Sequence, residues 1–396
     1  APTIAGVTLV VAGLLIALLP QRDPTGLGYA GMTHFVRLAV VLVGLVLLMV
    51  AANVPAGLRQ QRDADAAVEF DAGHAVGGEF LAFFLFSLTG VMLTAGAGDL
   101  AWLFLALELV SLPTYVMVAS SRDNPDAQEA AVKYFFLGAL ATAVFLYGFT
   151  LIYGATGFTD FASIRAYVDA AVETGRPLPP LLVTGVLLAV VGICYKAAAF
   201  PMHFYAADVY QGAATGVTAF LAFVPKAAGL VGIILVLSLV GWPLAKTPGI
   251  LDGGDALVWA LWAIAAVTMT LGNLLALLQD NVKRALAYSS VAHSGYMLVA
   301  VLAGPALGDA SSDTVLTDGL GAVLFYLVAY GLSTIAAFAA LGCLRTSSTG
   351  ERDELQTFAD LSGLRLRHPG LAVVLAVASL SLLGIPPLVG FLGKVY

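Results

Sequence analysis

The sequence contains few charged residues. Only 11% of its 396 residues are Asp, Glu, Lys or Arg, whereas about one quarter of the residues in a soluble domain are charged. Hydrophobic residues make up 60% of the chain, and its mean hydropathy is +0.94. These proportions exclude a water-soluble fold. The formal net charge of −7 provides no basic surface to neutralise phosphates, so the sequence also excludes nucleic acid as a partner.

Residues that bind metals and redox cofactors are scarce as well. The two cysteines, Cys194 and Cys343, lie far apart and form no CxxC motif, which argues against a disulfide framework, a zinc site or an iron–sulfur cluster. The five histidines show no paired helical spacing of the kind that binds haem. No glycine-rich phosphate loop follows a predicted strand. We therefore expect no metal or cofactor on this chain, and any redox reaction on another one.

Long apolar runs dominate the sequence. A bilayer core about 30 Å thick needs ~20 apolar residues per helix, and on this measure eleven runs are predicted to span a membrane: 4–19, 35–54, 79–98, 100–119, 127–153, 181–200, 216–240, 257–278, 284–303, 319–344 and 370–385. A twelfth run begins near 388. Because the chain starts without Met and stops inside an apolar run, we expect it to be truncated at both ends.

The connections between these runs carry an uneven distribution of basic residues. Of the 18 Lys and Arg residues, five fall in connections on one side, nine on the other and four inside predicted spans. The positive-inside rule places the side with nine in the cytoplasm. The longest connections, around 55–78, 154–180 and 345–369, are expected to hold short surface helices.

Five ionisable residues lie within predicted spans, and they define the candidate site: Glu108, Lys133, Lys196, Lys226 and Lys394. A charge at the centre of a membrane helix costs at least ~2.5 to 3.5 kcal/mol, so such residues are functional candidates by default. Burial disfavours the charged form of lysine and a nearby carboxylate favours it. A set of lysines with a movable carboxylate partner is therefore suited to exchanging protons.

Glu108 and Lys133 lie on consecutive predicted helices joined by a short connection, so we expect them to form a pair. Pro113 is expected to bend the first of these helices. A static ion pair that joins the two helices is the alternative interpretation. Lys226 lies near the middle of its span and is too deep to reach either surface easily.

Lys196 and Lys394 each accompany a helix breaker. Lys196 precedes Pro201 by five residues, and Lys394 follows the Pro386-Pro387 pair. Interrupted helices at corresponding positions of two halves are typical of transporters built from inverted repeats. The alternative is that the prolines only mark helix ends, since proline is common in membrane helices.

Several polar residues outside this set have weaker signals. His203 and His293 are candidate proton relays because imidazole titrates near neutrality, and a structural, hydrogen-bonded histidine is the alternative for each. Asp208 is expected to cap a helix or order a loop beyond Pro201. Lys283 and Arg284 begin a helix on the predicted cytoplasmic side, where lipid headgroups account for them, so we expect no transport role for these two.

Six stretches, in this order along the chain, resemble a known family. They are LALELVSLP at 105–113, AVKYF at 131–135, YKAAAFPMH at 195–203, DVYQGA at 208–213, NVKRALAYSSVAHSGY at 281–296 and GIPPLVGFLGK at 384–394. These stretches are similar to the antiporter-like membrane subunits of respiratory complex I, and the similarity runs from about residue 35 to the end. Lys394 stands where sister subunits tend to carry glutamate, which favours the subunit N branch.

The resemblance implies an all-α, polytopic transmembrane helical bundle with two inverted repeats and discontinuous helices. N-terminal helices would occupy 1–98, the first antiporter-like repeat 99–240, and an incomplete second repeat 257–396. Glu108 would be the coupling carboxylate, with Lys133 as its switchable partner. Lys196 and Lys226 would form an inner relay, with Lys394 near an exit. The family commonly has tryptophan and proline in the loop where this chain has Tyr205-Ala-Ala-Asp208. We therefore expect this loop to be more flexible than in the family.

The resemblance further implies a proton-translocating subunit of NADH:quinone oxidoreductase in the bacterial cytoplasmic membrane. Its partners would be the other membrane subunits of complex I, including neighbouring antiporter-like subunits, together with lipids and protons. NADH, FMN, iron–sulfur clusters and quinone would bind to partner subunits. Two alternatives remain open at this point: a subunit of a multi-subunit cation/proton antiporter, which has the same fold, and a non-conducting structural membrane subunit.

Overall fold

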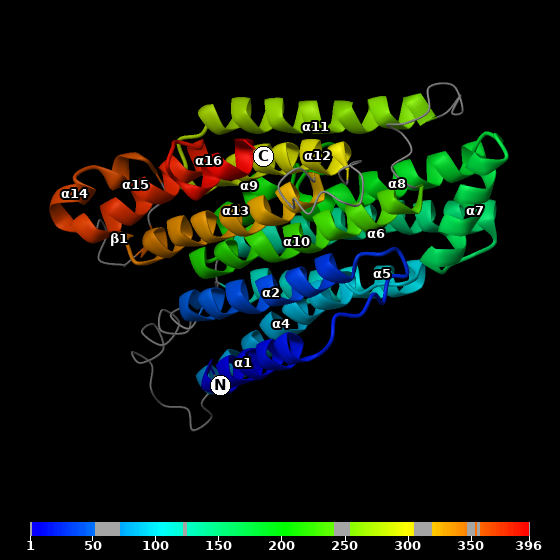
Figure 1. Ribbon diagram of the computed structural model, residues 1–396. Helices are drawn as coiled ribbons and strands as arrows, with labels where there is room; N and C mark the ends of the chain where they lie inside the picture. Colours follow the sequence, from blue (N-terminus) through cyan, green and yellow to red (C-terminus); the bar gives the residue numbers. More distant parts are fainter. Residues whose placement is uncertain are drawn as a thin grey trace.

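The structure, a computed structural model, describes residues 2–51, 72–121, 125–240, 254–304, 319–346, 353–354 and 357–395. Long helices lie side by side in one bundle (Figure 1). These helices are α1 (Pro2–Leu18), α2 (Ala30–Ala51), α4 (Ala72–Thr94), α5 (Leu100–Ala119), α6 (Pro125–Thr156), α8 (Pro180–Ala197), α10 (Thr215–Leu239), α11 (Gly254–Leu277), α12 (Val282–Ala303), α13 (Gly319–Gly342) and α15 (Pro369–Leu383).

The helices follow the predicted spans closely. Within the described ranges, nine helices are long and apolar enough to cross a membrane, while α1 and α15 are apolar but shorter. The predicted span 100–119 coincides with α5, whereas α2 begins five residues before the expected position 35. The chain is therefore an integral membrane protein whose fold is almost entirely helical, as predicted.

Helix α10 lies at the centre of the bundle (Figure 1). Every residue of its membrane-crossing window is buried inside the chain, because α10 is apolar on all sides and contacts helices all around it. Peripheral helices instead expose large apolar side chains such as Ile4, Phe136 and Trp259. In a bilayer these outward side chains would face away from the bundle. The buried share of each helix therefore distinguishes inner helices such as α10 from outer ones.

Helices α6 and α8 pack closely because small residues line their contact. A Cβ atom added to Gly148 would lie 2.5 Å from the backbone nitrogen of Ala189, and one added to Gly192 would lie 2.5 Å from that of Phe145. Close backbone approach at glycines is the common way for membrane helices to associate. This contact holds α8 in position between α6 and the central helix.

Two helices are broken at the predicted positions. Helix α8 ends at Ala197, Ala198 adopts a left-handed conformation with φ of 54°, and the short helix α9 (Ala206–Gly212) follows Pro201. Helix α15 ends before Gly384, whose φ is 86°, and the short helix α16 (Val389–Val395) follows Pro386 and Pro387. By contrast, α5 continues through Pro113 and α10 through Pro225.

Short surface elements cover the two ends of the bundle. Helix α7 (Phe161–Glu173) lies at one end, and Asp160 caps it by accepting a hydrogen bond from the backbone N–H of Ser163. Strands β1 (Arg345–Thr346) and β2 (Asp353–Glu354), the 3₁₀ helix η3 (Ala359–Leu361) and α14 (Leu364–Arg367) belong to the 345–369 connection, and α14 lies at the other end of the bundle (Figure 1). Surface helices are thus confirmed in two of the three long connections, and most of the third, 55–78, lies outside the described residues. The basic residues counted at 59, 62, 122, 246 and 352 also lie outside them.

Candidate functional site

Glu108 of α5 pairs with Lys196 of α8 inside the bundle. The Lys196 Nζ lies 3.3 Å from the Glu108 Oε1, and their side chains are 2% and 17% exposed. The hydroxyl of Thr142 donates a second hydrogen bond of 2.9 Å to the same carboxylate oxygen. Lys196 also donates to the hydroxyl of Ser111, three residues after Glu108. The pair is therefore buried and supported by hydroxyl groups from α5 and α6.

The expected pairing of Glu108 with Lys133 is wrong. Lys133 binds Asp208 Oδ2 of α9 and Glu129 Oε1 of its own helix, each at 2.7 Å, and its side chain is 41% exposed. The reason is the direction of the side chain around α6. That helix turns its Ala130, Ala131 and Tyr134 side inward, and Lys133 falls at the edge of this face.

Asp208 has a larger role in the fold than the sequence indicated. Besides Lys133 it accepts a 2.6 Å hydrogen bond from Arg284 Nη1 at the start of α12. Arg284 was assigned to lipid headgroups, and this ion pair corrects the assignment. Its neighbour Lys283 is also buried, with Nζ donating to the carbonyl oxygen of Ala213 at 3.1 Å. The start of α12 therefore contacts the segment after the first helix break.

Lys226 occupies the centre of α10 and is 1% exposed. Its Nζ donates to the carbonyl oxygen of Ser290 at 2.6 Å and to the hydroxyl of Ser294 at 2.5 Å, both on α12. It also lies 5.1 Å from the centre of the Tyr330 ring on α13. Across the part of the chain that the structure describes, no carboxylate forms an ion pair with Lys226. Its charged form is therefore stabilised by hydroxyl, carbonyl and ring groups alone.

Ser294 joins Lys226 to the break in α8. While it accepts from Lys226, its hydroxyl donates to the carbonyl oxygen of Ala197, the residue after Lys196 and the last of α8. Gly229 lets α10 approach the end of α8, because a Cβ atom added to this glycine would lie 2.8 Å from the Ala197 backbone nitrogen. Ser294 thus links Lys226 to the backbone at the end of α8, one residue after Lys196.

Glu108, Lys196, Ser294 and Lys226 are called the polar line below. His293 and three tyrosines extend it from Lys226 towards α16. The Nδ1 of His293 forms a 2.5 Å hydrogen bond with the Tyr326 hydroxyl, and the ring lies between Tyr296 and Tyr330. The Tyr330 ring also contacts Lys226, and the Tyr296 ring also contacts Lys394. The structure therefore places His293 between two of the predicted lysines.

Lys394 lies at the second break and is not buried. Its Nζ donates to the carbonyl oxygens of Leu382 at 2.8 Å and Leu383 at 3.1 Å, at the end of α15. It lies 5.0 Å from the centre of the Tyr296 ring. Among the predicted charges, α5, α8 and α10 direct theirs into the interior, whereas Lys133 is half exposed and paired with Asp208. The role of Lys394 stays a prediction.

His203 lies apart from this line. It is 4% exposed between α8 and α9, packs against Phe200 and Phe204, and its Nδ1 has no hydrogen-bond partner within the described ranges. No contact joins it to the lysines in that part of the chain.

Sequence reasoning missed the hydroxyl groups that join the charges. Ser111 follows Glu108 by three residues, and Ser290 and Ser294 are four residues apart, spacings that place side chains on one helix face. Serines at helical spacing beside a membrane-embedded charge were the available signal. The arrangement as a whole is a line of groups able to hold or pass a proton, with a buried acid and amine at one end.

A known protein family matches the part of the chain that holds these residues. The profile of the family described as NADH:quinone oxidoreductase/Mrp antiporter, TM, matches residues 97–396. The chain belongs to this family. The match includes α5 to α16, and so every residue of the polar line.

Curated relatives of this antiporter family narrow the similarity to one branch. The chain is 41% identical over 326 residues to NADH-quinone oxidoreductase subunit N 1 of Sorangium cellulosum. It is 42% identical over 319 residues to NADH-quinone oxidoreductase subunit N of Trichlorobacter lovleyi. Each alignment covers 81% of this chain and 60% of the relative. The chain thus spans about 60% of the length of these relatives.

Solved structures of the antiporter family share the fold. A chain of respiratory complex I from Thermus thermophilus with bound aureothin superposes with a TM-score of 0.66 at 31% identity, covering all of this chain and 81% of that one. A chain of the Mrp complex from Dietzia sp. gives a TM-score of 0.74 at 22% identity, covering 67% of that chain. The Mrp likeness shows the common fold alone.

Proposed function

We propose that this chain conducts protons across an energy-transducing membrane as subunit N of an NADH:quinone oxidoreductase. The observation that carries the proposal is the gathering of ionisable groups inside the bundle. The Glu108–Lys196 pair is buried, Ser294 binds both Lys226 and the last carbonyl of the Lys196 helix, and the Tyr330 ring lies against both Lys226 and His293. The similarity of the chain to its subunit N relatives supports the assignment to NADH:quinone oxidoreductase. Intramembrane charges on inner helices are expensive and typically mark proton relays.

The first step is opening of the Glu108–Lys196 pair. A carboxylate at 3.3 Å stabilises the ammonium form of Lys196. When Glu108 is protonated or moves away, the ammonium retains Ser111 but loses its counter-charge in a buried site. Lys196 then releases its proton more readily, so the state of the carboxylate controls the first transfer.

The second step passes the proton to Lys226. Ser294 accepts from Lys226 and donates to the carbonyl oxygen of Ala197, the residue after Lys196; in the proposed transfer its hydroxyl group leaves that carbonyl and turns towards Lys196. A charge on Lys226 then acts on His293 across the Tyr330 ring that both contact, and the Tyr296 ring lies in the same way between His293 and Lys394 at the second break. In this scheme Lys394 lies near the exit, and Lys133 belongs to the surface ion pairs with Asp208 that hold the segment after the first break.

The surrounding assignments follow from the same proposal. Other membrane subunits of complex I, including antiporter-like neighbours, would be the partners, and the bacterial cytoplasmic membrane the location. NADH, FMN, iron–sulfur clusters and quinone would bind to partner subunits. The division into a first repeat at 99–240 and a second at 257–396 belongs to this proposal, with His203 retained as a possible relay at the first break.

The test replaces Lys226 in the full-length chain within its assembled complex. Lys226→Met removes the charge while keeping an unbranched side chain of similar length, and Lys226→Arg is the matched control that keeps the charge. With the complex reconstituted in vesicles, proton translocation driven by NADH and quinone is expected to fall at least tenfold in the Met variant. Co-purification of the variant chain with the NADH-oxidising subunits in wild-type amounts verifies assembly.

Three outcomes separate the alternatives. Full proton translocation by an assembled Lys226→Met complex would show that the charges only join helices, as in a structural subunit. Proton movement that requires sodium and proceeds without quinone reduction would favour the cation/proton antiporter. Loss of quinone-coupled translocation with partial retention in the Arg variant supports the proposal.

A further inference from the structure

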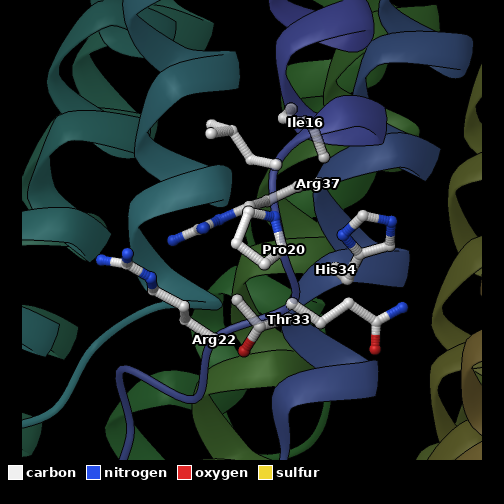
Figure 2. Close-up of a pocket in the computed structure, with 8 residues that line it drawn as sticks. Ile16, Pro20, Arg22, Thr33, His34 and Arg37 are labelled. Atoms are coloured by element: carbon white, nitrogen blue, oxygen red, sulfur yellow. The ribbon is translucent and has the colours of Figure 1, made fainter.

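A pocket of about 250 Å³ opens where α1 connects to α2. Its lining combines an apolar wall with basic and polar side chains, and it is formed by Ile16, Leu19, Pro20, Gln21, Arg22, Thr33, His34 and Arg37. Figure 2 shows the side chains of Arg22 and Arg37 extending to the same side of Pro20, with His34 on the other side. The pocket lies at the same end of the bundle as α7, because a Cβ atom added to Gly26 of this connection would lie 3.3 Å from the Cβ of Ala162 in α7.

Among the residues that the structure describes, the two arginines have no acidic partner. Arg37 lies on the membrane-spanning helix α2, where its Nε donates to the carbonyl oxygen of Met92 at 3.3 Å. The nearby acid, Asp23, is instead occupied by the Thr25 hydroxyl and the backbone N–H groups of Thr25 and Gly28. In the portion of the chain with described coordinates, neither Arg22 nor Arg37 forms an ion pair.

This arrangement matches a phosphate group. Guanidinium groups form strong, charge-assisted hydrogen bonds with phosphate oxygens, and basic pockets between membrane helices bind anionic lipid headgroups. A lone arginine on a membrane helix is costly unless it has a counter-charge. A phosphate between Arg22 and Arg37 would supply that counter-charge without altering the fold.

The apolar wall favours a membrane lipid as the source of the phosphate. Leu19 is 61% exposed and continues an outward apolar face of α1 that includes Leu15 and Leu18. An acyl chain could lie along this face while the headgroup occupies the pocket, whereas a free phosphate ion would gain nothing from it.

We propose that the α1–α2 pocket binds the phosphate of an anionic phospholipid through Arg22 and Arg37. This site is separate from the polar line that begins at Glu108, and it does not depend on the proposed transport function. It gives the lipid a defined place at the end of the bundle that also carries α7.

The experiment uses the full-length chain in its assembled complex, in nanodiscs of phosphatidylcholine with a minor fraction of photoactivatable phosphatidylglycerol that carries the reactive group near its headgroup. After illumination, mass spectrometry measures cross-linking to the peptide that contains residues 19–33. The variants are Arg22→Gln, Arg37→Gln and the double variant. Arg176→Gln is the matched control, an exposed arginine in the connection that follows α7.

The expected result is strong cross-linking in the wild type, at least tenfold less in the double variant and no change in Arg176→Gln. Arg22→Gln keeps the test valid if Arg37→Gln prevents assembly, because Arg22 is exposed in a connection. Unlabelled phosphatidylglycerol should compete. Competition of equal strength by soluble glycerol phosphate would support a phosphate site filled from solution and overturn the lipid as its source. Unchanged cross-linking in both Arg22→Gln and the double variant would overturn the site itself.

Discussion

Replacing Lys196 with Met is expected to destabilise α8 strongly, because Glu108 would keep its charge without a partner. At the observed 3.3 Å separation and an effective dielectric constant of ~20, the attraction between the two charges is about 5 kcal/mol. Removing one partner of a buried pair typically costs about 3 to 5 kcal/mol. The two estimates agree, so the Met variant should populate an open state of this region far more often.

The chain contains its own reporter for this opening. Cys194 is buried and lies two residues before Lys196 on α8. The other cysteine, Cys343, is exposed and serves as the reference thiol. When opening is fast, the labelling of a buried thiol follows the population of the open state. A loss of about 3 to 5 kcal/mol should raise the rate at which a membrane-permeant maleimide labels Cys194 by roughly 10² to 4 × 10³-fold, as each 1.4 kcal/mol is tenfold. Labelling of Cys343 should not change.

Two further variants make the reasoning refutable. Lys133→Met removes a partner from a half-exposed pair, which is worth about 1 kcal/mol or less, so Cys194 labelling should rise less than about fivefold. The double variant Glu108→Gln with Lys196→Met removes both charges and should restore most of the protection. If Lys196→Met raised labelling no more than Lys133→Met does, the buried pair would not stabilise this region and the estimate would be refuted.

Two other predictions follow from the packing around the line. Ser294→Ala removes one of two α12 acceptors of Lys226; since a hydrogen bond to a charged group contributes about 1.5 to 3 kcal/mol, proton translocation should slow about tenfold or more. The control Ser238→Ala, whose hydroxyl donates within its own helix, should leave it unchanged. Gly192→Ala places a methyl group against Phe145 and should cost about 1 to 3 kcal/mol, seen as less assembled chain in membranes. Gly154→Ala, which meets only Leu181 at 3.7 Å, should assemble normally, and equal assembly of both variants would contradict the packing argument.

The sequence predicted the membrane class and most of the helices because both depend on local properties. A run such as 100–119 is long and apolar whatever surrounds it, and crossing a bilayer requires such a run to become a helix. The breaks after Ala197 and Leu383 were also local, since Pro201 and the Pro386-Pro387 pair remove backbone hydrogen-bond donors. Even Lys226 was recognised as deeply buried from its distance to both ends of α10.

The partner of each charge was decided by the tertiary structure. Glu108 and Lys133 are close along the chain, yet Glu108 binds Lys196, 88 residues away, and Lys133 binds Asp208. Which side chains meet depends on how each helix is rotated about its axis, and the glycine contacts between α6 and α8 fix that rotation for these two helices. The sequence alone therefore determined which charges enter the membrane. Packing determined which of them share an interior, because a residue's direction is fixed only when its helix meets its neighbours.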